Sequence, residues 1–167
     1  MDFTFTKRQY ICKNVLVIKI KKLFGWLPTK REKMREKTIL TKDYLNKEKV
    51  LFKIEELGEK YHYVIEKSET YANADIDFYT DNNYDYLISF RFILEENFNR
   101  DPELINGENY YFYIVITHDS DLLSKLNIIL KDILSEYPEM YVTDEMYKDF
   151  YNIDDINSGN VDDWLKV

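Results

Sequence analysis

The sequence predicts an α+β fold, in which two main helices pack on an antiparallel sheet (a meander) of four or five strands. Alternating aromatic and β-branched residues mark the strands along the middle of the chain. A long apolar stripe at helical spacing follows them, which is typical of a helix that covers a sheet. The segments run helix, strands, helix, short strand, and this separation of helices from strands favours α+β.

The first expected helix covers about residues 42–57. Thr41 is a suitable N-cap, because its hydroxyl can accept a bond from a free backbone N–H of the first turn. Gly58 suits the position after the helix end, where a left-handed conformation is common. The apolar residues at helical spacing are Leu51, Ile54 and Leu57.

Four strands are expected after this helix, and a tight turn makes the second and third of them antiparallel. The turn is Asp-Asn-Asn at 81–83, since Asn and Asp tolerate positive φ. A polar loop, 95–109, precedes the fourth strand. The expected strands are 61–66, 75–80, 84–94 and 110–117.

Alternation within the two longest strands predicts which side chains face the core. In 84–94 the expected inward set is Tyr86, Ile88, Phe90 and Phe92, with Asp85, Ser89 and Arg91 opposite. In 110–117 the expected inward set is Phe112, Ile114 and Ile116, with Tyr111 and Tyr113 opposite.

The second helix is the clearest element of the sequence. Pro138 ends it, and Asp119 or Ser120 is the expected N-cap. A short strand, 140–143, and an acidic tail follow. The helical stripe consists of Leu122, Leu126, Ile129 and Ile133.

The first forty residues differ in charge from the rest of the chain. Residues 1–40 carry 11 Lys or Arg against 3 Asp or Glu, a net charge of +8, whereas residues 41–167 carry 12 against 28, a net charge of −16. We expect a basic segment, 1–40, joined to or part of an acidic α+β domain, 41–167. Within the segment, 15–20 fits a strand or a helix, and 30–37 (KREKMREK) fits a solvated helix with ion pairs.

The basic segment also supports a membrane-surface alternative through residues 13–37. Phe24, Trp26 and Leu27 lie among lysines, as in anchors on anionic lipid. The lysines of 13–22 do not collect on one helical face, which weighs against this role.

The composition excludes several classes of protein. A single cysteine, Cys12, excludes an internal disulfide framework, and the four glycines form no phosphate-binding loop. No apolar run reaches 18 residues and the start is a poor signal peptide, so we expect a cytoplasmic protein without cofactor. A strongly acidic domain disfavours nucleic acid and favours a basic protein partner. The sequence leaves the oligomeric state open.

His118, Asp119 and Asp121 are the candidates for chemistry. With Asp75 or Asp77 they fit a metal-dependent hydrolase. The simpler interpretation is a capped helix start, because Asp and Ser accept bonds from free N–H groups there and acids suit the helix dipole. Asp75 and Asp77 likewise suit solvent-facing strand positions, with Asp77 paired to Arg91 across the turn.

Acids and aromatics alternate in the last third of the chain, where 132–167 holds ten acids and two lysines. Tyr and Trp are favoured interface anchors, and carboxylates around them orient a partner and speed its association. An ordinary solvated surface, with the aromatics in the core, explains the pattern equally well. The candidate partner-binding residues are Asp144, Glu145, Tyr147, Asp149, Tyr151, Asp154 and Asp155.

The chain resembles the immunity proteins of bacterial polymorphic toxin systems over about residues 41–150. The likeness lies in a helix, a Tyr-rich meander, the strand YYFYIVITHDSD, the helix LLSKLNIILKDILSEYP and the short MYVTDEM. The resemblance implies a small acidic cytoplasmic protein that binds one cognate toxin domain and blocks it without turnover. It assigns no functional residue, and the basic first forty residues depart from its pattern.

Overall fold

The computed structural model describes residues 34–68, 74–80 and 87–166. Within them, antiparallel strands form one sheet in the order β2-β3-β4-β6-β1-β7, and β5 pairs with β6 alone. The α+β class is therefore confirmed, with more strands than expected. The strands are β1 (Met34–Thr41), β2 (Val64–Lys67), β3 (Ile76–Tyr79), β4 (Leu87–Phe92), β5 (Glu103–Ile105), β6 (Glu108–Asp119) and β7 (Tyr141–Asp144).

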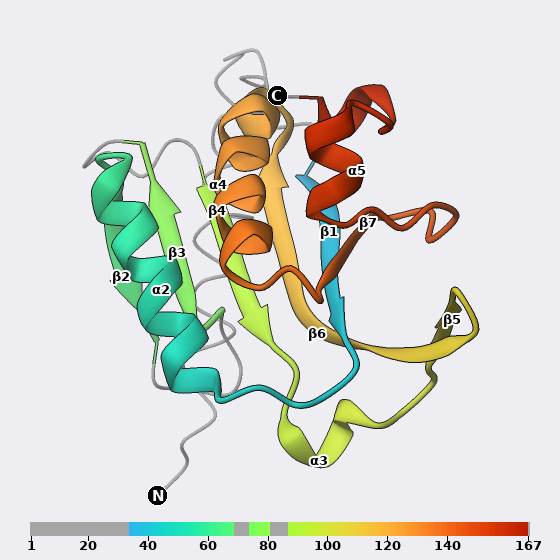
Figure 1. Ribbon diagram of the computed structural model, residues 1–167. Helices are drawn as coiled ribbons and strands as arrows, with labels where there is room; N and C mark the ends of the chain where they lie inside the picture. Colours follow the sequence, from blue (N-terminus) through green and yellow to red (C-terminus); the bar gives the residue numbers. More distant parts are fainter. Residues whose placement is uncertain (1–33, 69–73, 81–86, 167) are drawn as a thin grey trace, which may run out of the picture.

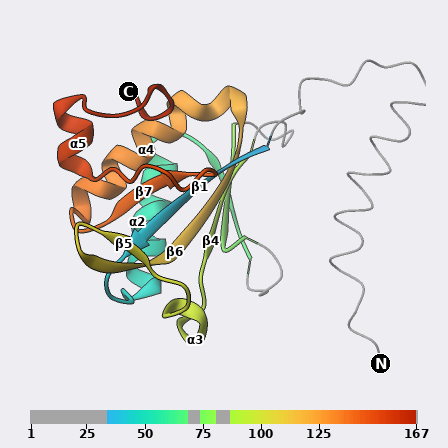
Figure 2. The same ribbon diagram turned by 90° about the vertical axis from the view of Figure 1, so that its right-hand side faces the viewer.

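Three helices cover one face of this sheet. Figure 1 shows α2, α4 and α5 in front of the strands, and Figure 2 places all three on the same side. In the described part of the chain, none of the helices has the length and apolar character needed to span a membrane. The α-helices are α2 (Lys47–Lys60), α3 (Glu95–Phe98), α4 (Leu123–Glu136) and α5 (Ile153–Ser158), and the 3-10 turns are η1 (Ser120–Leu122) and η2 (Asp163–Leu165).

The central strand β6 contains a bulge, and the alternation expected for this strand is therefore wrong. Ile39 of β1 pairs with Ile114, but the next residue pairs with Phe112, so Tyr113 is the extra residue. The bulge shifts the alternation by one, so Tyr113 and Ile114 are both fully buried in the main core. Phe112 was expected in that core but packs against a second, smaller cluster.

The N-terminal part of β1 corrects the expectation of a solvated helix over 30–37. Residues 34–37 are extended, and β1 lies between β6 and β7 in the sheet. The last seven residues of the basic segment 1–40 therefore belong to the same folded unit as the acidic domain. Residues 1–33, which include Cys12 and the strand or helix expected over 15–20, lie outside the described residues.

The helix α2 begins and ends later than expected. Asn46, rather than Thr41, is its N-cap and accepts a bond from the Lys49 N–H. At the other end, the N–H of Tyr63 bonds to the carbonyl of Gly58 at 2.9 Å, and that of His62 to the carbonyl of Glu59 at 3.0 Å. These two bonds form a Schellman motif, in which His62 takes the left-handed position (φ 61°) expected of Gly58.

Gly58 lies instead inside α2, on its buried face toward β2 and β3. A Cβ atom there would lie 2.7 Å from two ring atoms of Phe78 and 2.9 Å from a methyl of Ile65. Phe78 cannot move easily, because it is fully buried and its ring contacts those of Tyr63 and Phe90. The glycine therefore sets how closely this helix packs on β3.

The helix α4 confirms the expected apolar stripe, and Leu126, Ile129 and Ile133 are fully buried. The expected cap is wrong in its detail: neither Asp119 nor Ser120 caps the helix start with its side chain. A 3-10 turn, η1, comes between the strand and the helix, and the Asp119 carboxylate accepts the Leu87 N–H of β4 at 2.9 Å.

The strands β3 and β4 confirm the expected antiparallel pair, although the turn at 81–83 lies outside the described residues. Asp77 faces Ser89 in the register rather than Arg91, so the expected cross-strand ion pair is wrong. Burial raises the pKa of Asp77, and the hydrogen bond from Ser89 opposes that rise. The loop expected at 95–109 contains α3 and β5.

We predict that Gly58→Ala destabilises the protein by about 1–3 kcal/mol. Alanine is the better helix former, by roughly 1 kcal/mol, but its methyl group cannot fit against Phe78 without displacing the core. Chemical denaturation measures the change. Glu59→Ala, at the exposed neighbouring position, should stay within about 0.5 kcal/mol of the wild type. A Gly58→Ala protein more stable than the wild type would contradict the close packing.

Candidate functional site

The candidate partner-binding residues lie on one side of the molecule, along β7, the following loop and the start of α5 (Figure 1). β7 is the last strand of the sheet, and its outer side makes one isolated bridge, from Val142 to Tyr151. This edge combines side chains with internal contacts and side chains that face solvent.

Tyr147 folds back from the loop over the face of the sheet opposite the helices. Its backbone takes a positive φ of 49°. Its ring packs edge-on against Phe112, with centroids 5.5 Å apart, and its hydroxyl donates to the Glu36 carboxylate at 2.9 Å. The side chain stays 38% exposed, so Tyr147 is both anchored to the sheet and accessible to a partner.

Two basic side chains of β1 lie near the acids next to this loop. Arg35 forms an ion pair with Glu145. Lys37 is only 6% exposed, and its ammonium lies 3.9 Å from the ring centroid of Trp164 in η2. Burial lowers the pKa of Lys37, while Asp144 and Glu145 act in the opposite direction. The acids therefore compensate for two cations of the sheet as well as facing outward.

Tyr151 and Asp155 have structural contacts of their own. Tyr151 packs on the main core and lies 5.9 Å from Trp164 between ring centroids. Asp155 completes a capping box at the start of α5, where its carboxylate accepts the Asn152 N–H at 3.0 Å and Asn152 caps in return. Asp144 similarly accepts the Met146 N–H at 2.9 Å.

Five exposed acids of this C-terminal region are together named the acidic rim, and two of them are already paired, Glu145 with Arg35 and Asp163 with Lys166. Two exposed apolar side chains, Met146 (59%) and Tyr147 (38%), adjoin it. Met34, at 49% exposed, starts the strand whose next two residues contact Glu145 and Tyr147. The acidic rim consists of Glu145, Asp149, Asp154, Asp162 and Asp163.

His118 is buried on the core side of β6. It is fully inaccessible to solvent, and its Nδ1 lies 2.9 Å from the Asp119 carbonyl oxygen. Its Nε2 has no hydrogen-bond partner among the described residues. Burial lowers the pKa of His118 below 6.5, and the Lys37 ammonium acts in the same direction. His118 is therefore enclosed within the core of the described residues.

The acids expected beside His118 in a metal site are used elsewhere. Asp119 binds the backbone of β4, and Asp121 is exposed. Asp75 pairs with Lys47 and accepts the Phe92 N–H at 2.7 Å. Across 34–68, 74–80 and 87–166, no three His, Cys, Asp or Glu side chains are grouped to hold a metal ion. The residues that would form the hydrolase site are therefore not brought together.

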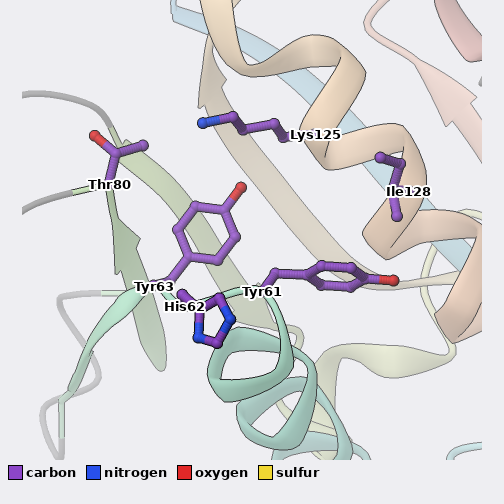
Figure 3. Close-up of a pocket in the computed structure, with 6 residues that line it drawn as sticks. All are labelled: Tyr61, His62, Tyr63, Thr80, Lys125 and Ile128. Carbon is purple, nitrogen blue, oxygen red and sulfur yellow. The ribbon is translucent and has the colours of Figure 1, made fainter.

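A separate pocket of about 210 Å³ lies between α2, β3 and α4 (Figure 3). The sequence reasoning missed it, because its residues come from three distant parts of the chain. The only local signal is the Tyr-His-Tyr sequence at the end of α2. The lining residues are Tyr61, His62, Tyr63, Thr80, Lys125 and Ile128.

In comparisons with protein-family models, curated proteins and solved structures, nothing matches this chain. Its function must therefore be inferred from its own residues.

We predict that buried His118 makes the protein lose stability as the pH falls below about 6.5. Because burial lowers the folded-state pKa, the unfolded chain takes up a proton that the folded chain excludes, and this favours unfolding. Denaturant titrations from pH 7.5 to 5 measure the loss, and His118→Leu should flatten the curve. His62→Asn, which replaces the other histidine with a residue that tolerates positive φ, should not. Parallel curves for His118→Leu and the wild type would contradict this origin.

Proposed function

We propose that this chain is a binding protein of the immunity type, which neutralises a basic cognate toxin domain by stoichiometric occlusion. The observation that carries the proposal is the acidic rim, with Met146 and Tyr147 exposed beside it. The rim supplies long-range attraction to a basic partner, and the apolar side chains supply contact area that loses water on binding.

Anchoring of Tyr147 supports its role as a contact residue. Its ring and hydroxyl are held by Phe112 and Glu36 before any partner arrives. A side chain already fixed in position loses little conformational entropy on binding, so more of its contact energy is retained. The loop thus presents a rigid aromatic group within a negative field.

Binding without turnover agrees better with this geometry than the two alternatives do. The hydrolase alternative lacks an assembled ligand set among the described residues. The membrane-surface alternative depends on 13–37, of which only 34–37 lie in the described part, as residues of the sheet.

The direct test is protection. Where a large secreted protein is encoded immediately upstream of this chain, its C-terminal domain is the candidate partner to express. Expressed alone, that domain should arrest cell growth, and co-expression with this chain should restore growth through a one-to-one complex. Absence of both rescue and complex formation would refute the proposal.

We predict that Asp149→Lys combined with Asp154→Lys slows association with the toxin domain by about ten-fold at low salt. The difference should shrink as salt increases, because ions screen exposed charges. Stopped-flow mixing measures the rate, and thermal melting checks the fold, since Asp154 lies in the first turn of α5.

The matched control is Asp43→Lys combined with Glu59→Lys, which makes the same charge change at exposed positions outside β7, α5 and the loop between them. It should associate within about two-fold of the wild-type rate. Equal slowing by both double variants would show that net charge, and not the acidic rim, governs the encounter.

A further inference from the structure

The Tyr61–Tyr63 turn presents three consecutive ring side chains at the end of α2. The Schellman bonds to Gly58 and Glu59 fix this turn, and His62 occupies a left-handed position that glycine or asparagine would fill with less strain. Strain retained at a surface turn is a feature of functional sites. In Figure 3 the Tyr63 ring points toward Lys125 of α4, the Tyr61 ring lies below Ile128, and the His62 ring lies lower in the view, on the side away from Lys125.

The pocket is rich in hydrogen-bond donors. Lys125 contributes an ammonium, and Thr80 and Tyr63 contribute hydroxyls. Figure 3 shows the Lys125 side chain extending from α4 toward Thr80, with the Tyr63 hydroxyl directed to the same region. Burial raises the pKa of Tyr63, so its phenol remains protonated and able to donate at neutral pH.

No described residue that lines the pocket is acidic, although residues 41–167 carry 28 acids against 12 bases. The nearby Asp132 is already bound: Lys60 donates to it at 2.6 Å and the Tyr61 hydroxyl at 2.7 Å. Figure 3 shows that Tyr61 hydroxyl directed away from the other lining groups. Among the described residues, Lys125 has no carboxylate partner. Within the described residues, the pocket therefore offers a lysine ammonium without a carboxylate partner.

The walls set the size and shape of the occupant. The Tyr63 ring is fixed by stacking on Phe78, with centroids 5.3 Å apart and planes 18° from parallel. Ile128 adds an apolar surface that is 39% exposed. A volume of about 210 Å³ is below the range of drug-sized sites and suits a single ring. One lysine with neutral donors matches the single charge of a carboxylate better than the double charge of a phosphate.

We propose that this pocket binds a small aromatic carboxylate, with the ring between Tyr63 and Ile128 and the carboxylate at Lys125 and Thr80. The site lies at the β2 side of the sheet, away from the acidic rim beside β7. It is therefore independent of the proposed toxin-binding function.

Titration of the full ¹⁵N-labelled chain with benzoate tests the proposal. Benzoate should produce saturable amide shifts in 61–63 and 125–128. Benzyl alcohol, which keeps the ring but lacks the charge, should bind at least about ten-fold more weakly. Shifts that do not saturate, that lie elsewhere, or that are equal for the two probes would overturn the proposal.

Two lysine variants on the same helix separate a local contact from a change in net charge. Lys125→Met should weaken benzoate binding at least about ten-fold, because it removes the carboxylate partner. Lys131→Met makes the same change on α4 at a residue that does not line the pocket, and should leave binding unchanged. Equal affinity of Lys125→Met and the wild type would overturn the assigned orientation and with it the site.

Discussion

The bulge at Tyr113 in β6 is the constraint on which the rest of the structure depends. β6 pairs with β4, β1 and β5, so any error in its register spreads to most of the sheet. In a regular strand, a shift of one residue would exchange the buried and exposed faces. Here the extra residue makes that exchange once, inside the strand. Ile114 and Ile116 face the helices, while Phe112 and Tyr110 pack with Leu40 on the second cluster.

This exchange also explains how the sheet is covered on two sides. Side chains from β5, β7 and the loop after β7 pack in the second cluster, and they include Phe150 and Tyr141. Tyr147 reaches the same face through Phe112. The loop that carries part of the acidic rim therefore packs on the side chains that the bulge turns to this face of the sheet. Its position depends on core packing more than on its own sequence.

The sequence could predict what short-range patterns determine. The stripe of α4 and the alternation of β3 and β4 are periodic and local, and both are found in the structure. The strand β1 could not be predicted from residues 30–37, because their many charged side chains indicate a solvent-exposed segment rather than a strand inside a sheet. Arg35 is stabilised in the strand by an ion pair with Glu145, and Lys37 by a cation–π contact with the Trp164 ring. Both partners lie more than 100 residues away in the sequence. Such long-range pairing overrides local propensity.

Short-range sequence patterns were also insufficient to predict the contacts of individual side chains in the two sites. Asp119 has the composition of a helix cap, yet its carboxylate binds β4. Asp154 and Asp155 look alike in the sequence, but only Asp155 closes a capping box, which leaves Asp154 for the surface. The pocket left almost no trace, since Tyr63 and Lys125 meet only after α2 and α4 have packed on the sheet.

The helix α4 contacts both the pocket and the C-terminal segment next to the acidic rim. Its Lys125 and Ile128 line the pocket. Between them in sequence, buried Asn127 turns toward the C-terminal segment, where its amide donates to the Trp164 carbonyl at 2.7 Å. Because Trp164 in turn covers Lys37 beneath the acids of β7, a movement of α4 would alter both surfaces. The fully buried residues Leu126, Ile129 and Leu130 oppose such a movement. We therefore expect α4 to stay fixed, so that binding at one site does not affect the other.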